Sequence, residues 1–232
     1  MSASIPLIVG ALIGVAAGSL LVPVTRRELA AAVVRTSKNT PETQPGEALA
    51  ADQKLKGWHW AALALLSGLL PAYVLHGVGW SLTALPPLLL AVGLIQLSYC
   101  DITRRLLPKT MVYGLTGIVV ASAISVAADL HMWERLKIAS IGGLIFFAVF
   151  LAINLMNPRW MAFGDVRLSL VVGFGLAWIS PIALLEGFAV ANLLAAVVGS
   201  LLIVAHRAER RSGVPFGLFL ALGAALVLLT WA

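Results

Sequence analysis

Runs of roughly 20 apolar residues, separated by short polar turns, occupy most of this 232-residue chain. Hydrophobic residues make up 60% of it and charged residues only 11%, whereas about 25% of the residues in a typical soluble domain are charged. A helix of about 20 apolar residues crosses the hydrocarbon core of a bilayer and bonds all of its own backbone polar groups. The sequence therefore predicts an all-α protein that crosses the membrane several times.

Eight segments are predicted to span the bilayer, within a single membrane domain that covers residues 1–232. The apolar stretch 166–204 is too long for one crossing at about 1.5 Å per residue, so we expect the WISP sequence at 178–181 to form a tight hairpin. HGVGWS divides the run 58–100 in the same way. The predicted spans are 5–24, 58–77, 81–100, 108–128, 138–157, 166–180, 181–204 and 215–231.

The distribution of basic residues predicts the orientation of these spans. With the N-terminus outside, all but two of the 16 Lys and Arg residues lie in or beside the inner loops, and the exceptions are Arg135 and Lys137. Inner loops carry such an excess of positive charge in membrane proteins. The formal net charge of +6 is thus explained without a nucleic-acid partner. The predicted inner loops are 25–57, 101–107, 158–165 and 205–214.

The loop 25–57 is the only sizeable segment outside the predicted spans. It is rich in Thr, Pro, Glu and Gln and has little apolar surface to bury, so we expect a flexible cytosolic loop. The single cysteine, Cys100, excludes an internal disulfide and a CxxC zinc module. The four histidines are scattered without ligand spacing, which argues against a histidine metal site.

Two acids, Asp101 and Asp165, fall at the inner ends of predicted spans although 64 residues separate them in sequence. Asp165 follows Gly164 at the start of a helix, where free N–H groups and the positive end of the helix dipole favour an anion. Two neighbouring carboxylates do not both ionise cheaply, so they share one proton. Such a pair can hydrolyse a peptide bond, because the ionised acid takes a proton from water while the protonated acid polarises the carbonyl oxygen.

The same two residues also have simpler interpretations. Asp101 could pair with Arg104 or Arg105 at helical spacing, and Asp165 could do no more than cap its own helix. The spacing of the acids alone does not decide between a structural and a catalytic pair.

Three motifs resemble those of the prepilin peptidases, which are membrane aspartic peptidases of the Gly-x-Gly-Asp type. CDITRRLLPKTMVYG at 100–114 is similar to the first aspartate motif of that family, and AFGDVRL at 162–168 to the second. GVPFGLFLALGAAL at 213–226 resembles the Pro-Phe-Gly segment that opens the family's last helix. The motifs occur in family order, and the resemblance runs from about residue 81 to the end of the chain.

The resemblance implies a cytosol-facing endopeptidase of the bacterial inner membrane that removes the leader of type IV prepilins or pseudopilins, with no metal or other cofactor. It identifies Asp101 and Asp165 as the catalytic acids. Because the loop contains no cysteine, the resemblance is to the shorter members that serve Flp or Tad-type pili, which implies cleavage without N-methylation. The other matched positions, to which we assign supporting roles, are Gly164, Arg167, Pro108, Pro215, Phe216 and Gly217.

The chain departs from the family pattern at several positions. Ala162 replaces the first glycine of Gly-x-Gly-Asp, and an added methyl group at a tight approach could shift Asp165 and weaken catalysis. Lys109 stands where Asn is usual, and Arg167 where Lys is usual. A catalytically inactive homologue therefore remains an alternative, as does an ion- or proton-coupled transporter that uses the same two acids.

Other residues within the spans receive structural interpretations. Glu186 lies near the outer end of its span, where we expect a hydrated or helix-pairing role. Several glycines are predicted to permit close helix contacts: Gly142, Gly143, Gly173, Gly175 and Gly199.

Overall fold

A computed structural model describes residues 81–104, 109–157, 162–204 and 216–231, with residues 23, 24, 27 and 69 as isolated positions. Apart from those positions, the predicted spans 5–24 and 58–77 and the loop 25–57 lie outside the described residues, as do Pro108 and Pro215. The described ranges are helical and contain no strand. They form the 3-10 turn η1 (Leu82–Ala84) and the helices α4 (Leu85–Arg104), α5 (Lys109–Leu130), α6 (Trp133–Met156), α7 (Phe163–Ile179), α8 (Pro181–Val204) and α9 (Phe216–Trp231).

These six helices correspond to the six spans predicted from residue 81 onward, with different ends. α6 begins at Trp133, five residues before the predicted 138, with Glu134 in its first turn, where an acid is favoured by the helix dipole. α7 begins at Phe163 instead of 166, so Asp165 lies inside its first turn. α4 continues to Arg104, which places Asp101 in its last turn.

Four of the described segments are long and apolar enough to cross a membrane: Leu82–Asp101, Lys109–Leu130, Trp133–Met156 and Pro181–Leu201. α9 is apolar but shorter, at 16 residues. The outer faces of α5, α6 and α8 expose large apolar side chains such as Ile118, Leu144 and Leu193. This is the pattern of a multi-pass membrane protein, in which the lipid-facing surface is as apolar as the core.

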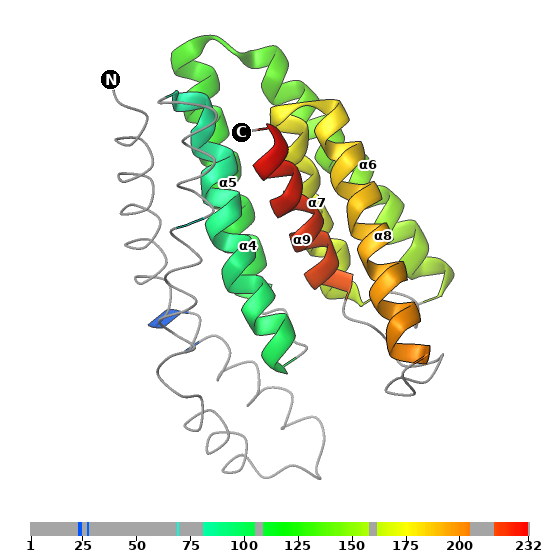
Figure 1. The fold of residues 1–232 in the computed structure, drawn as a ribbon. Coiled ribbons are helices and arrows are strands. Elements are labelled where there is room, and N and C mark those ends of the chain that lie inside the picture. Colours follow the sequence, from blue (N-terminus) through cyan, green and yellow to red (C-terminus); the bar gives the residue numbers. More distant parts are fainter. Residues whose placement is uncertain are drawn as a thin grey trace.

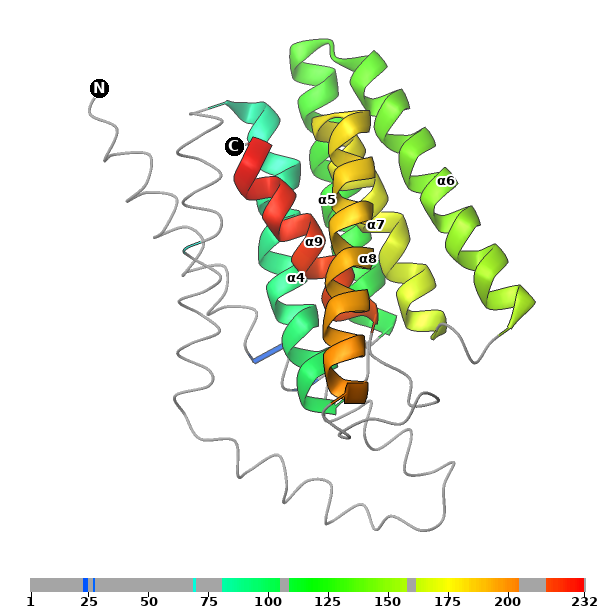
Figure 2. The ribbon, with the colours of Figure 1, turned by 45° about the vertical axis from the view of Figure 1, so that its right-hand side comes forward.

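α7 is the central helix of the bundle. It contacts α4, α5, α6, α8 and α9, and most of its residues are buried. Figure 1 shows α9 lying in front of α7. Figure 2, turned by 45°, shows α9 passing between α4 and α8, and α9 contacts both of them. The start of α9 is therefore placed where it can meet residues from the helices on either side.

Glycines from both helices allow α6 and α7 to cross closely. A Cβ on Gly143 of α6 would lie 3.1 Å from the Leu170 carbonyl oxygen of α7, and one on Gly173 would lie 2.7 Å from Cβ of Phe146. Packing of small residues is the usual basis of helix association in a membrane. The predicted role of Gly199 is wrong for the described part of the chain, where a Cβ on this residue would meet nothing within 4 Å.

The hairpin predicted at WISP is confirmed. α7 ends at Ile179 and α8 begins at Pro181, and the Ser180 hydroxyl accepts a hydrogen bond from the Ile182 N–H at 3.1 Å. A serine before the helix and proline at its first position are favoured residues for a helix start.

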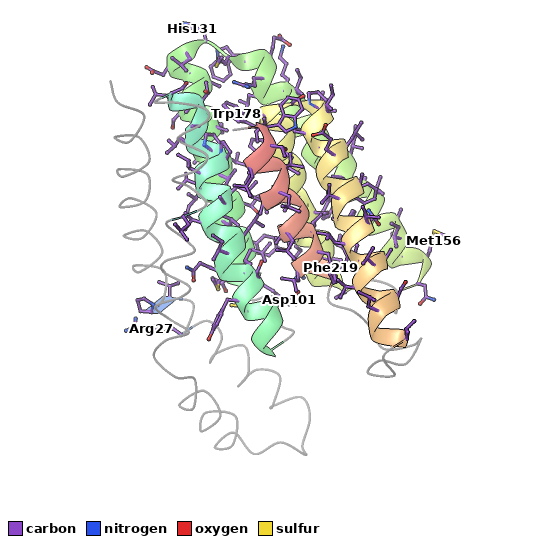
Figure 3. The ribbon with its side chains drawn as sticks, viewed as in Figure 1. Arg27, Asp101, His131, Met156, Trp178 and Phe219 are labelled. Atoms are coloured by element: carbon purple, nitrogen blue, oxygen red, sulfur yellow. The ribbon has the colours of Figure 1, made fainter. Side chains whose placement is uncertain are left out.

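Arg135 of α6 forms hydrogen bonds with the end of α7 at this hairpin. Its Nε donates to the Trp178 carbonyl at 2.8 Å and its Nη2 to the Ile179 carbonyl at 3.3 Å. The Trp178 indole N–H in turn donates to the Thr83 carbonyl at 3.0 Å. Figure 3 shows Trp178 and His131 at one end of the bundle and Asp101 at the other.

Candidate active site

Asp101 is held at one end of the bundle by the last turn of α4. Its side chain is only 5% exposed, and a buried carboxylate is costly unless hydrogen bonds replace its lost hydration. One such bond comes from α9, where the Leu218 N–H donates to Asp101 Oδ2 at 3.1 Å. The chain thus brings together residues that are 117 positions apart in sequence.

Asp165 is the third residue of α7 and is also 5% exposed. Its carboxyl group accepts hydrogen bonds from the backbone N–H of Ala162, which is the N-cap of α7, and from that of Gly217 at the start of α9. The bond to the N-cap is one half of a capping box, in which an acid at the third position reaches back to the cap. Asp165 therefore caps α7, and it does more than the simpler interpretation allowed, because it also reaches a second helix.

The two acids meet at the first turn of α9. Gly217 and Leu218 are consecutive, and each donates its N–H to one of the two carboxyl groups. Standard bond lengths then place the two carboxylates within about 10 Å of each other, and the charge of Asp101 acts on Asp165. The N–H groups of a first helical turn have no partner within their own helix, and the dipole there favours negative charge.

Phe216, the first residue of α9, packs in a cluster of phenylalanine rings from three helices. Its ring centroid lies 5.7 Å from that of Phe150 in α6. Phe150 lies 4.9 Å from Phe146, and both rings contact Phe188 of α8. Tilted and edge-on pairs at these separations are favourable, so the cluster fixes where α9 begins.

Arg167 lies on α7, two residues beyond Asp165. Its guanidinium is 4.5 Å from the Phe163 ring centroid and 5.6 Å from that of Tyr113 in α5. The Arg167 Nε is buried and makes no hydrogen bond within the described part of the chain. The flat guanidinium stacks on aromatic faces in a way that lysine does not, so Arg167 links α7 to α5.

The substitution at Ala162 does not strain the backbone. Ala162 has φ −72° and ψ 144°, which is an ordinary extended conformation open to any residue, and its side chain is exposed. Gly164 is half-buried in the first turn of α7, next to Asp165.

Other predicted residues take no part in the bonds between α9 and the two acids, or lie beyond the described chain. Lys109 is exposed at the first position of α5, and the side chains of Arg104 and Arg105 are outside the described residues. Glu186 accepts a hydrogen bond from the Trp231 indole N–H, which agrees with the expected helix-pairing role. Within the described ranges, no group of three or more His, Cys, Asp or Glu residues is placed to hold a metal ion.

The Leu218 amide, which donates to Asp101, is not predictable from the motifs. The motifs concern side chains, whereas every residue except proline carries a backbone N–H. A usable signal was present nonetheless: the residue before α9 is Pro215, whose side chain has no hydrogen-bond acceptor. A buried helix start without a capping side chain must find its acceptors elsewhere.

Long apolar helices and two buried acids at one end of the bundle indicate the class of protein: a multi-pass membrane protein with a pair of acids. Comparison with known families identifies which one. Residues 88–230 match the type IV leader peptidase family, and the chain belongs to that family, which confirms the resemblance seen in the three motifs.

Relatives with assigned names agree with the family. The chain is 30% identical over 170 residues to the prepilin leader peptidase/N-methyltransferase of Stutzerimonas stutzeri and 29% identical over 176 residues to that of Pseudomonas aeruginosa. These matches cover 72% and 75% of the chain, but only 56% and 59% of the relatives. The chain thus spans somewhat more than half the length of the relatives it matches. No solved structure gives a significant match.

Proposed function

We propose that this protein is an aspartic endopeptidase that removes the leader peptide of type IV prepilins or pseudopilins, of the Flp or Tad type. The observation that carries the proposal is the placement of Asp101 and Asp165 at the start of α9, each bonded to one of two successive backbone amides. Membership of the leader peptidase family supplies the reaction and the class of substrate. The acid pair supplies the chemistry.

In the proposed mechanism the two acids share one proton, because two neighbouring carboxylates do not both ionise at low cost. The ionised acid takes a proton from a water molecule, whose oxygen attacks the scissile carbonyl carbon. The protonated acid donates a hydrogen bond to the carbonyl oxygen as negative charge develops there. Collapse of the tetrahedral intermediate breaks the C–N bond, the leaving amine takes a proton, and the products are a carboxylic acid and a free amine.

We place this site at the cytosolic face of the bacterial inner membrane, with the N-terminus of the chain outside. The proposal is supported by the basic residues that follow Asp101 in the sequence, Arg104 and Arg105, and by the positive-inside rule. These charges repel a basic leader. Recognition of the substrate would therefore depend on its apolar helix, which can lie in the bilayer beside the enzyme.

We further propose that the protein cleaves without methylating the new N-terminus. The support is the composition of the segment 25–57, which contains no cysteine, whereas the family members that do both reactions carry a cysteine-rich loop. A methyl-transfer assay on the cleaved product tests this part separately.

Processing of a candidate prepilin in membranes tests the proposed peptidase activity. Asp101→Asn and Asp165→Asn remove an ionisable group but keep the size of the side chain, so each should abolish cleavage while the protein level is unchanged. Asp129→Asn is the matched control, because Asp129 is exposed in the last turn of α5 and should tolerate the change. Normal processing in either Asp101→Asn or Asp165→Asn would reject an aspartic mechanism, and failure of the wild type to cleave any prepilin would favour an inactive homologue or a transporter.

A further inference from the structure

The residue that directly precedes α9 in the sequence has no side chain able to cap the helix. The preceding residue in the sequence is Pro215, which offers no side-chain acceptor. The acceptors instead come from two other helices, since Asp101 of α4 takes the Leu218 N–H and Asp165 of α7 takes the Gly217 N–H. One helix start thus binds both acids.

The position of this helix start is set independently of the acids. Phe216 packs on Phe150 of α6, at 5.7 Å between ring centroids, and Phe150 belongs to the aromatic cluster shared with α8. Three residues after Phe216, Phe219 is 4% exposed and lies in the buried face of α9. Figure 3 shows Phe219 and Asp101 at the same end of the bundle. Packing therefore holds the two amides in place whether or not the acids are charged.

We propose that the backbone amide of Leu218 is a positioning group for the reaction: it holds Asp101 in register with Asp165, so that the pair can share a proton and activate water. The inference rests on the proposed aspartic mechanism and adds to it the group that aligns the acids. A hydrogen bond to a charged acceptor contributes more than one between neutral groups. In a buried site there is no bulk water to replace it.

Proline at position 218 removes this donor with little other change. Leu218 is the third residue of α9, so its N–H has no partner within the helix, and proline is tolerated in a first turn. Proline disfavours a helical conformation in the residue before it partly through a clash with that residue's Cβ, and Gly217 has no Cβ. Leu218→Ala is the matched control, because it loses the same side chain and keeps the N–H.

The experiment measures kcat and KM for cleavage of a purified prepilin by Leu218→Pro and Leu218→Ala. If the amide aligns Asp101, kcat of Leu218→Pro falls roughly 10- to 100-fold below that of Leu218→Ala, while KM of the two variants agrees within about twofold, because substrate binding is not affected. Equal kcat values in the two variants would overturn the inference. That outcome differs from failure of the proposed function, in which Asp101→Asn itself would remain active.

Loss of folded protein in Leu218→Pro would call for a second variant. Replacement of the Leu218 amide by a backbone ester keeps the side chain and removes only the N–H. The same loss of kcat is expected there, and unchanged kcat in the ester variant would overturn the inference.

Discussion

Even one added methyl group at Gly223 should destabilise the crossing of α8 and α9. A Cβ on Gly223 would lie 2.5 Å from the Gly187 carbonyl oxygen and 2.9 Å from both the backbone nitrogen and Cβ of Ala191. Two of these three atoms belong to the backbone of α8, so relief requires the helices to separate. Overpacking of this kind costs about 1–3 kcal/mol, and the better helix propensity of alanine offsets about 0.5–1 kcal/mol. The net expected loss for Gly223→Ala is about 0.5–2 kcal/mol.

Thermal unfolding of the purified protein in detergent measures this loss. For a chain of this size, 1 kcal/mol corresponds to about 2–4 °C in Tm, so Gly223→Ala should lower Tm by about 1–8 °C. Gly199→Ala is the control on α8, because a Cβ there meets nothing within 4 Å among the described residues, and it should keep or raise Tm. A Gly223→Ala protein as stable as the wild type would refute the packing argument for this crossing.

Three further predictions concern residues around the bundle. Arg135→Ala removes two hydrogen bonds to carbonyl groups at the end of α7 and should lower stability by about 1–2 kcal/mol in the same unfolding assay; no change in Tm would show that the bonds contribute nothing. Ala162→Gly should alter kcat/KM for prepilin cleavage by less than about threefold, because the residue is exposed and its backbone is already in an ordinary extended conformation. A tenfold gain would mean that the methyl group impairs the site. A double-mutant cycle of Glu186→Gln and Trp231→Phe should give a coupling of less than about 1 kcal/mol, as expected for an exposed pair, with processing intact; loss of cleavage would assign Glu186 a functional role.

The helices beyond residue 81 could be predicted from the sequence because apolar length alone decides whether a segment can cross a bilayer. The ends of these helices are harder to predict from the sequence. The apolar run of α7 starts at Val166, but the helix begins at Phe163, because the acid at the third position caps it. A hydropathy pattern does not show where a side chain caps the start of a helix.

The candidate site could be predicted only in part. Asp101 and Asp165 stand out in sequence as acids beside apolar runs, and motif order pairs them. Their bonds to α9 could not be foreseen, because backbone donors leave no pattern in the side chains. The wrong expectation for Gly199 has a related cause: a glycine indicates that close packing is possible, while the face it occupies depends on how the helices rotate against each other.

The most direct test of the account is a cross-link between positions 101 and 165. Cys100 is the only cysteine, so Cys100→Ser gives a background free of thiols into which Asp101→Cys and Asp165→Cys are introduced together. A bifunctional thiol reagent with a reach of about 10 Å, the separation inferred from bond lengths, should join the two. The combination of Asp129→Cys and Asp165→Cys should not react in this way, because Asp129 lies one residue from the far end of α5. Absence of a 101–165 cross-link, when each cysteine alone reacts with a monofunctional reagent, would contradict the claim that the start of α9 brings the two acids together.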